Sequence, residues 1–441
     1  MTSQQSGGWT ACLMQGLREN GRALGVLVAL SVLLFLITVA TYSALGVVLP
    51  DMVREMHWNW AEAGLGFTLL GVACGASSWL PRILIRRFGI QTTLIAGTLV
   101  MSGGLLGLGL SHGLPVYFAS ALACGIGYQM MALIPGTYVI AGLFRSRARV
   151  FGFYYAAASA GGIAGPWVVF AIMAFCSWRQ FWFVQAGLSL AIGLIGALAV
   201  GFLSLPKAEA PRPEKERQAP AASGRPVWTV AEVLRTPQFY ILLAAYFSHL
   251  LSGSTVASVS VAHLTERGIP LGVAGAMLSL ESIMGLGGRM MSGVLGDRIS
   301  PKHLLLFALA VNAMGCFALA GANSYVTMIL YATGTGLGFG LTAVAVAVLL
   351  LDYYGREHNL EIFSLTCLIG ALSALGPVIS GVIRDRYGSF SPAFQLFGAA
   401  ILLIGVVAVF MRPPVHRAQA AGEAAELDPP RAALAAGNDL G

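Results

Sequence analysis

Three stretches of this chain contain no charged side chain over lengths that no soluble fold requires: residues 23–50, 88–144 and 303–351. A helix crosses the hydrocarbon core of a bilayer with about 20 apolar residues, whereas a strand of a membrane barrel needs about 10 of alternating polarity. The two longer stretches therefore hold two helices each. Only 10% of the residues are charged, against about 25% in soluble domains, which excludes a water-soluble globular protein.

Turn signals divide the two longest stretches, at Ser111-His112-Gly113 with Pro115 and at Gly-Ala-Asn-Ser in 321–324. The sequence thus predicts an all-α membrane protein with twelve transmembrane helices in two pseudo-symmetric six-helix halves. The predicted spans are 24–49, 63–81, 90–110, 115–142, 150–175, 181–204, 237–263, 271–294, 303–321, 325–351, 360–383 and 391–411.

The charge distribution predicts the orientation. With twelve spans both termini lie on one side, and a cytoplasmic N-terminus places twenty Lys and Arg residues inside. Five are then outside, namely Arg54, Arg179, Arg267, Arg384 and Arg386. This is the positive-inside bias of a multi-pass protein of the cell (inner) membrane with both termini cytoplasmic. The net charge of +7 therefore indicates no nucleic-acid partner.

Composition divides the chain further. The expected segments are a cytoplasmic N-terminal segment at 1–22, an N-terminal half at 23–204, a Pro- and charge-rich cytoplasmic linker at 205–235, a C-terminal half at 236–411 and a disordered cytoplasmic tail at 412–441. Residues 1–22 lack the short apolar core and cleavage site of a removable signal peptide. The six cysteines are scattered singly, so we expect no disulfide framework, metal site or cofactor.

An internal repeat appears at an offset of 211 residues. Gly125-Ile-Gly127 falls on Gly336-Leu-Gly338, and Gly165-Pro166 falls on the Gly-Pro pair at 376–377. Arginine and Ala-Gly positions match at the same offset, from span two to span five without a gap. Two repeated halves joined by a linker are typical of transporters in which a midplane site between the halves opens to each side in turn.

The loop after span eight, with Gly288, Arg289, Gly293, Asp297 and Arg298, resembles the G-x-x-x-D-R signature of the major facilitator superfamily. In that superfamily the glycines let helices approach closely, and the Asp-Arg pair latches the cytoplasmic face; the resemblance thus implies a gating role for Asp297 and Arg298. The N-terminal copy departs from the pattern, because Arg86 occupies the position of the acidic residue.

Three further stretches are similar to the bacterial monocarboxylate and oxalate:formate porter group of that superfamily. They are Gly46 to Pro50 continued by His57 to Glu62, His263-Leu-Thr-Glu266-Arg-Gly268, and Asp352-Tyr-Tyr-Gly-Arg356. The superfamily likeness covers nearly all of 24–411. In this group an arginine in span eight is implicated in holding the substrate carboxylate, so the resemblance implies that role for Arg289.

Arg289 is the only basic residue left inside a predicted span. A cation there costs at least about 2.5 kcal/mol, and its planar guanidinium matches the two oxygens of a carboxylate. Two roles stay open: an anion site, or a structural arginine that reaches the cytoplasmic latch two turns away. Span eleven lacks the lysine of oxalate-type porters, and a single fixed positive charge favours a monoanion.

Glu281 is the only carboxylate well inside a span, eight residues before Arg289 and therefore about 12 Å away along the helix. A carboxylate away from bulk water can take up and release a proton near neutral pH. The group often has an Asp one turn before the arginine, where this chain has Gly285. We therefore expect Glu281, or alternatively Glu266 at the outer loop, to carry a coupling proton. Without that role, Glu281 would be a carboxylate in an aqueous cavity or hydrogen-bonded to a neighbouring helix, and Glu266 a solvated loop charge.

Polar groups in other spans are weaker candidates. Tyr42 in span one and Gln129 in span four are expected to line the substrate site. His249, Tyr154 and Tyr155 are equally compatible with packing or interfacial anchoring. The glycine-rich stretches around 103–109 and 334–340 lie inside apolar spans, so they indicate close helix packing rather than phosphate loops.

The sequence therefore predicts a secondary active transporter, a proton-coupled symporter, that moves a small organic anion, a monocarboxylate, by alternating access. Efflux of an amphipathic or drug-like compound, or anion exchange, is the alternative. We expect no enzyme, because the spans contain no nucleophile elbow, ligand cluster or carboxylate pair. The expected partners are the anion, a proton and the lipid bilayer, and we expect a monomer.

Overall fold

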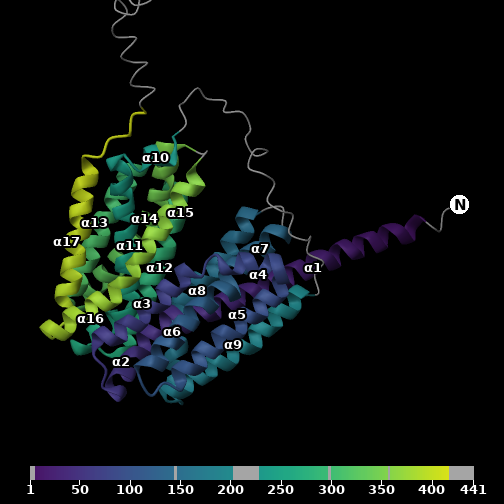
Figure 1. The fold of residues 1–441 in the computed structure, drawn as a ribbon, viewed down its shortest axis with the longest axis horizontal. Helices are drawn as coiled ribbons and strands as arrows, with labels where there is room; N and C mark the ends of the chain where they lie inside the picture. The colour runs from purple at the N-terminus through teal and green to yellow at the C-terminus, as the bar shows by residue number, and fades with distance from the viewer. Residues whose placement is uncertain (1–4, 144–146, 202–227, 296–298, 356–357, 417–441) are drawn as a thin grey trace, which may run out of the picture.

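The structure is a computed structural model that describes residues 5–143, 147–201, 228–295, 299–355 and 358–416. All regular structure in these ranges is helical (Figure 1). The N-terminal half contains α1 (Gln5–Thr38), the π-helix η1 (Val39–Ser43), α2 (Ala44–Met56), α3 (Trp60–Ala76), α4 (Leu80–Phe88), α5 (Ile90–Gly109), α6 (Leu114–Tyr128), the π-helix η2 (Gln129–Leu133), α7 (Ile134–Leu143), α8 (Arg147–Met173) and α9 (Trp178–Gly201).

The C-terminal half follows the same plan. It contains α10 (Val230–Val233), α11 (Pro237–Glu266), α12 (Leu271–Leu295), α13 (Pro301–Ala320), α14 (Tyr325–Tyr354), α15 (Asn359–Gly370), the 3-10 helix η4 (Ala371–Leu375), α16 (Gly376–Tyr387) and α17 (Ser391–Val409).

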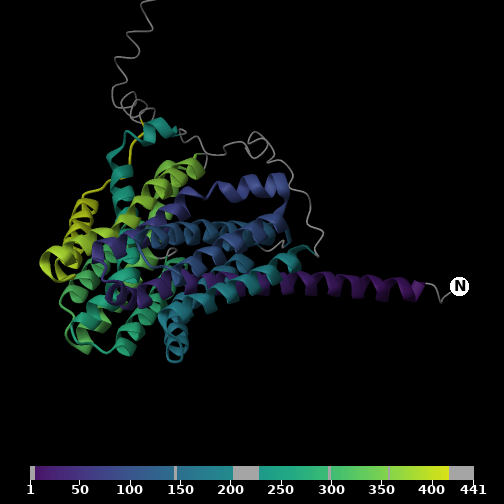
Figure 2. The ribbon, with the colours of Figure 1, turned by 60° about the horizontal axis from the view of Figure 1, so that its bottom comes forward.

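The described helices confirm the predicted all-α membrane architecture. Eleven are long and apolar enough to cross a bilayer, and the pair α3 and α4, bent by 49°, brings the number to as many as twelve. Several helices extend past the predicted spans: α11 and α14 have 30 residues each, and the first part of α1 projects beyond the bundle (Figure 2).

Local chemistry explains the breaks between spans. The backbone N–H of Asn59 donates to the Glu62 carboxylate (3.0 Å) at the start of α3. Ser324 and Thr327 cap α14 in the same way, with the Ser324 N–H donating to Thr327 Oγ1 (3.1 Å). These contacts satisfy N–H groups that the first turn of a helix leaves open. Gly89 ends α4 at a φ of 85°, a conformation that favours glycine.

The repeat at 211 residues governs how helices pack within each half. Gly125 of α6 lies against the backbone of α3, and Gly127 lies against α5; Gly336 and Gly338 of α14 lie against α12 and α13. The contacted residues obey the same offset: they are Leu70 and Met101 in the first half and Glu281 and Asn312 in the second. None of these four glycines leaves room for a Cβ, so their close approach is part of the repeat.

The offset also relates contacts between the halves. Gly64 of α3 packs on Pro377 of α16, and its counterpart Gly275 of α12 packs on Pro166 of α8. Adding 211 to the residue of the first half and subtracting 211 from the residue of the second half thus converts one contact into the other. This reciprocity is what a pseudo-two-fold relation between repeated halves requires.

The halves share an apolar core at one end of the bundle, and α3 also contacts η4 further along, where Gly71 and Gly75 lie against Ala374 and Ala371. One apolar core unites the N-terminal half with the parts of α11, α12, α14 and α17 near residues 256–264, 274–278, 328–332 and 394. A second core belongs to the C-terminal half alone and includes residues 239–245 and 341–354. We call the end where α9 ends and α10 begins the linker end, and the other the closed end. Figure 1 shows the halves diverging toward the linker end.

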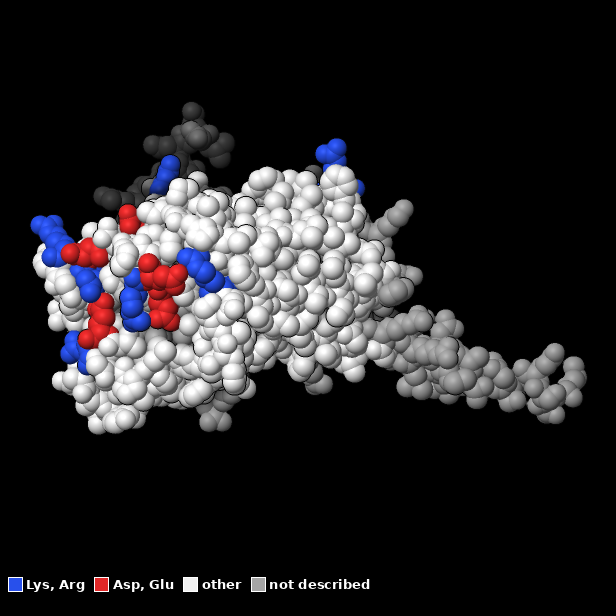
Figure 3. All heavy atoms as spheres, turned by 90° about the horizontal axis from the view of Figure 1, so that it is seen from below, with Lys and Arg blue, Asp and Glu red and all other residues white. Residues whose placement is uncertain are grey.

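Charged side chains gather at the closed end, where Figure 3 shows acidic and basic groups intermingled. All five arginines that the sequence places outside belong to helix ends or loops at this end: Arg54, Arg179, Arg267, Arg384 and Arg386. They therefore share one end of the bundle, as the charge count requires.

The predicted linker and tail are described in part. Residues 205–227 and 417–441 lie outside the described ranges. The rest of the predicted linker contains α10, and Trp228 packs edge-on against Tyr354 (5.5 Å between ring centroids) and His416 (4.8 Å). Lys302 Nζ donates to the backbone carbonyls of Val409 (2.8 Å) and Met411 (2.6 Å). The last part of the linker and the first part of the tail therefore pack on the C-terminal half.

Candidate functional site

One face of α12 contacts the other half at regular intervals. Gly275 lies against Phe170 of α8, and Ser282 lies against Gly162 of α8, where a Cβ would come within 3.0 Å of Ser282 Oγ. These positions on α12 are seven residues, or two turns, apart. Arg289 is the next member of the series, two turns closer to the linker end. Its Cα therefore lies near the same face of α12, at the level where the halves diverge, and its side chain extends over Phe339 of α14.

Arg289 is an exposed residue although it lies inside a span. Its Cζ stands over the ring of Phe339 (5.2 Å to the centroid). Phe339 in turn packs on His249 (5.2 Å between centroids), which contacts Tyr246 (4.8 Å). Among the described residues Arg289 forms no ion pair. An exposed cation beside aromatic rings offers a carboxylate its charge and its planar fork.

The depth of this arginine follows from its neighbours. Phe339 and His249 both lie near the middle of 30-residue helices. Gly340 of α14 lies against the Arg289 backbone, where a Cβ would come within 2.9 Å of its nitrogen. The glycine-rich stretch predicted to pack helices closely thus brings α14 against α12 at this site.

Glu281 lies two turns from Arg289 on the same helix and is partly buried. The Ser282 hydroxyl donates to its carboxylate (3.4 Å). Arg289 and the fully buried Tyr331 of α14 are both close enough to interact with it electrostatically. The structure thus places the two ionisable groups of span eight near one another, beside the contact between the halves.

The two candidates of the N-terminal half lie in π-helical turns. Tyr42 belongs to η1, and its side chain is outside the described part of the structure. Gln129 begins η2 and is buried, and its Oε1 has no hydrogen-bond partner among the described residues. Single π-turns inside α-helices are frequent at functional sites.

The paired tyrosines of α8 have different surroundings. The Tyr154 hydroxyl is fully buried and donates to the carbonyl oxygen of Ala132 in η2 (2.7 Å), so it stabilises the irregular turn. Tyr155 is 45% exposed. It lies two turns before Gly162, the residue that meets Ser282, and because α8 and α12 run antiparallel it stands at the level of Arg289.

The remaining candidates lie elsewhere. Glu266 ends α11 at the closed end and forms an ion pair with Arg384 of α16 (3.0 Å). Arg289 is 18 residues further along from the start of α12, about 27 Å at the helical rise. Asp297 and Arg298 lie outside the described residues. Sequence reasoning missed Phe339, Tyr246 and Ser282, and only the seven-residue spacing of Ser282 from Arg289 signals one of them.

A carboxylate fastens the halves together at the closed end. The N–H groups of Trp60 and Ala61, at the start of α3, donate to Asp385 Oδ1 (3.0 Å) and Oδ2 (2.8 Å) at the end of α16. The Trp60 ring packs edge-on against Phe390 (5.0 Å). The partial positive charge of a helix N-terminus favours an anion, so Asp385 holds α3 of one half to α16 of the other.

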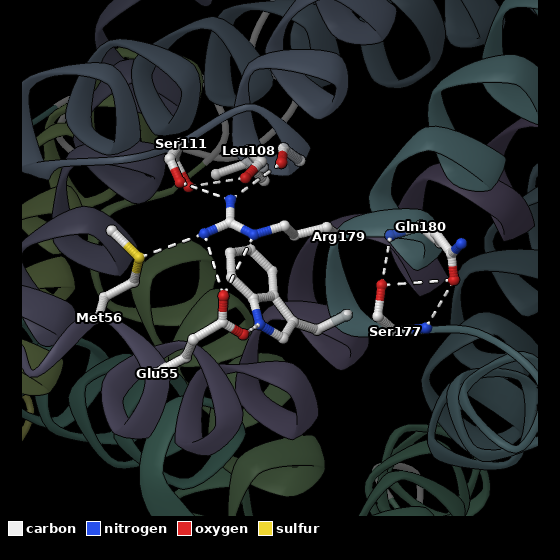
Figure 4. A network of polar contacts seen from close by, with 9 residues as sticks. Glu55, Met56, Leu108, Ser111, Ser177, Arg179 and Gln180 are labelled. Atoms are coloured by element: carbon white, nitrogen blue, oxygen red, sulfur yellow. Dashed lines mark hydrogen bonds and ion pairs between the residues drawn. The ribbon is translucent and has the colours of Figure 1, made fainter.

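Arginines tie down loops at the same end. In Figure 4, Arg179 contacts Glu55 (3.2 Å), and its Nη1 donates to the carbonyls of Ser111 (2.7 Å) and Gly109 (3.3 Å). The Trp178 indole N–H donates to the same Glu55 carboxylate. This network fixes the carbonyl end of α5, whose last C=O groups have no partner within the helix.

In the C-terminal half an arginine from a different helix end holds the corresponding carbonyl groups. Arg267 donates to the carbonyls of Ala322 (2.7 Å) and Ala320 (3.3 Å) at the end of α13. These carbonyls are the counterparts, at the 211-residue offset, of those held by Arg179. The carbonyl oxygens that accept are therefore related by the repeat, whereas the donating arginine comes from a different helix end in each half. In both halves an arginine thus holds the loop at the closed end.

We expect Asp385→Ala to loosen the closed end. The substitution leaves two N–H groups of α3 without their charged acceptor, a contact worth about 1.5–3 kcal/mol. A cysteine placed at the fully buried Ala63 should then react about tenfold or more faster with a water-soluble maleimide. Asp51→Ala is the matched control, because Asp51 pairs with Arg54 of its own helix. Equal labelling rates in the wild type and Asp385→Ala would show that Asp385 does not hold the halves together.

Comparison with known proteins identifies relatives of the whole fold. The model of the Major Facilitator Superfamily matches residues 31–359 and, in an overlapping match, 242–437. The Aspyridones efflux protein apdF of Emericella nidulans is 23% identical over 340 residues, 75% of this chain and 62% of the fungal protein, so less than two thirds of that protein's length is spanned. Monocarboxylate transporter 3 of Rattus norvegicus is 24% identical over 391 residues, 84% of this chain and 77% of the rat protein.

A solved structure shares the fold at low identity. A mutant of the nucleoside transporter NupG superposes with a TM-score of 0.70 at 15% identity, covering 87% of this chain and 99% of that one. At this identity the likeness concerns the fold alone.

Proposed function

Because the chain belongs to the Major Facilitator Superfamily, and is thus a multi-pass membrane transporter, we propose that it moves a small organic anion, a monocarboxylate, by alternating access coupled to protons. The observation that carries the proposal is Arg289: an exposed side chain inside a span, without an ion pair in the described structure, on the helix that packs against α8 of the other half. A cation kept there at a cost is expected to have an anionic ligand.

The chemistry of the site favours one carboxylate. One fixed positive charge neutralises a monoanion and leaves a dianion half compensated. The Phe339 and Tyr246 rings offer apolar surface for a short organic group beside the charge. A relative whose name is Monocarboxylate transporter 3 is consistent with this class.

The positions of Arg289 and Glu281 support the proposed coupling to protons. While Glu281 is ionised it competes with the substrate for the positive field of Arg289, and a proton on Glu281 removes that competition. Proton loading and anion binding therefore favour one another. Ser282, which donates to Glu281, also meets α8 of the other half, so the proton site lies where the halves move against each other.

The arrangement of the halves corresponds to one state of the cycle. Asp385 and the shared apolar core hold the closed end, while the halves diverge toward the linker end. We propose that the linker end faces the cytoplasm of a cell whose inner membrane holds the protein. A cysteine at Asn323 should then be labelled by an impermeant reagent from outside and one placed in 208–225 should not; labelling of both from one side would contradict the orientation.

Efflux of an amphipathic compound is the second candidate, favoured by the relative apdF. The discriminating experiment is competition against uptake of a labelled monocarboxylate by unlabelled monocarboxylates and by their amides, which have the same shape without the charge. Carboxylates should compete at least about thirtyfold better, since a charge-assisted bidentate contact is worth about 2–3 kcal/mol. Equal competition by acid and amide would favour the efflux function.

A further inference from the structure

A long part of the N-terminal half carries basic residues and no acidic residue in its sequence. The sequence contains no Asp or Glu between Glu62 and Glu209. Its arginines in that stretch, apart from Arg179 at the closed end, are Arg82, Arg86, Arg87, Arg145, Arg147 and Arg149. The acidic residues of this half, Asp51, Glu55 and Glu62, all lie at the closed end.

Three of these arginines share the short helix α4, which bends away from α3 by 49°. Pro81 and Ile85 turn one side of α4 toward the bundle and are buried. The opposite side is exposed and combines Arg82, Arg86 and Arg87 with two large apolar side chains, Trp79 (61% exposed) and Ile83 (48%), and Phe88 (55%) is exposed at the end of the helix. A helix of this composition suits the boundary between lipid headgroups and acyl chains.

The repeat shows that this charge is specific to one half. At the 211-residue offset Arg86 corresponds to Asp297, so the second half has an acidic residue beside its arginine where the first has a second arginine. Among the described residues Arg82, Arg86 and Arg87 form no ion pair with an acidic side chain. Arg87 instead lies over the ring of Phe88 (5.5 Å). The three charges therefore remain available to an external anion.

We propose that the exposed side of α4 binds an anionic phospholipid, with Arg82, Arg86 and Arg87 around the headgroup phosphate and Trp79, Ile83 and Phe88 in the interfacial layer. Basic side chains supply the charge complementarity, and arginine matches phosphate oxygens bidentately. The apolar residues on the same side favour a lipid over a soluble anion, because they can pack against acyl chains and a soluble anion offers them no apolar surface. The acidic tail residues Glu423, Glu426 and Asp428 are the competing occupants.

The test compares lipids retained by the full-length protein. The protein is reconstituted with phosphatidylcholine and phosphatidylglycerol, extracted gently and analysed by native mass spectrometry. The wild type should retain phosphatidylglycerol preferentially. Each arginine changed to glutamine should lower that preference about fivefold, so the triple variant of Arg82, Arg86 and Arg87 should lose nearly all of it. Arg86→Asp, which restores the acidic residue of the other half, should lower it without disturbing the fold.

Control variants make the outcome decisive. Arg54→Gln with Arg386→Gln removes two exposed arginines at the closed end and should leave the preference unchanged. A preference that survives in the triple variant would overturn the proposal. So would a preference absent from the wild type that emerges when Glu423, Glu426 and Asp428 are neutralised, because the tail would then occupy α4.

Discussion

Arg289→Lys is expected to lose most carboxylate transport although the positive charge is kept. A lysine ammonium cannot form two parallel bonds to a carboxylate, does not stack on Phe339 as a planar group does, and loses its proton more readily when desolvated. The lost contact is worth about 2–3 kcal/mol, so the substrate affinity should fall about thirty- to a hundredfold. The concentration dependence of monocarboxylate uptake into proteoliposomes measures this directly.

A structural role for Arg289 makes a different prediction. If the residue merely supports the loop that holds Asp297, lysine should largely suffice, and Arg289→Ala should impair expression and the transport of every substrate alike. Arg54→Lys, at a position whose side chain is 80% exposed, is the matched control and should change nothing. Normal carboxylate affinity in Arg289→Lys would remove the arginine from the site and favour efflux.

Glu281→Gln is expected to abolish the dependence of uptake on a pH gradient while exchange of substrate continues in part. Glutamine keeps the shape of the side chain and can still accept from Ser282, but it cannot carry a proton. Uptake under an inward proton gradient should therefore fall to the level seen without a gradient. The exchange of labelled for unlabelled substrate, measured in the same vesicles, shows that the variant is folded and binds.

Glu266→Gln provides the comparison. Glu266 pairs with Arg384 at the closed end, about 27 Å along the bundle from Arg289, so we expect its substitution to leave proton coupling in place. If instead Glu281→Gln accumulates substrate normally and Glu266→Gln does not, the coupling proton belongs to the closed end.

Features encoded by spacing were accessible from the sequence. Uncharged stretches of the length of one or two spans predict the helices, and the 211-residue offset predicts a relation that the packing of Gly64 and Gly275 reproduces. Arg289 stood out because a charge inside a span is costly. These inferences need no knowledge of which helix lies beside which.

Features that depend on neighbouring helices were not accessible. The stacking of Phe339 under Arg289 and the meeting of Ser282 with Gly162 require the positions of α14 and α8. In the sequence Asp385 resembles any charged residue near a loop, because nothing in the neighbouring residues reveals that the start of α3 contacts it. The π-turns that hold Tyr42 and Gln129 likewise depend on tertiary contacts such as that of Tyr154 with Ala132.

Concentrative uptake tests the central claim most directly. Proteoliposomes containing the purified protein are given a labelled monocarboxylate with an inward proton gradient and no other energy source. We predict accumulation of the anion above its external concentration, which a protonophore collapses and which the amide of the same acid does not show. Equal internal and external concentrations whatever the gradient, or accumulation of acid and amide alike, would contradict proton-coupled monocarboxylate transport.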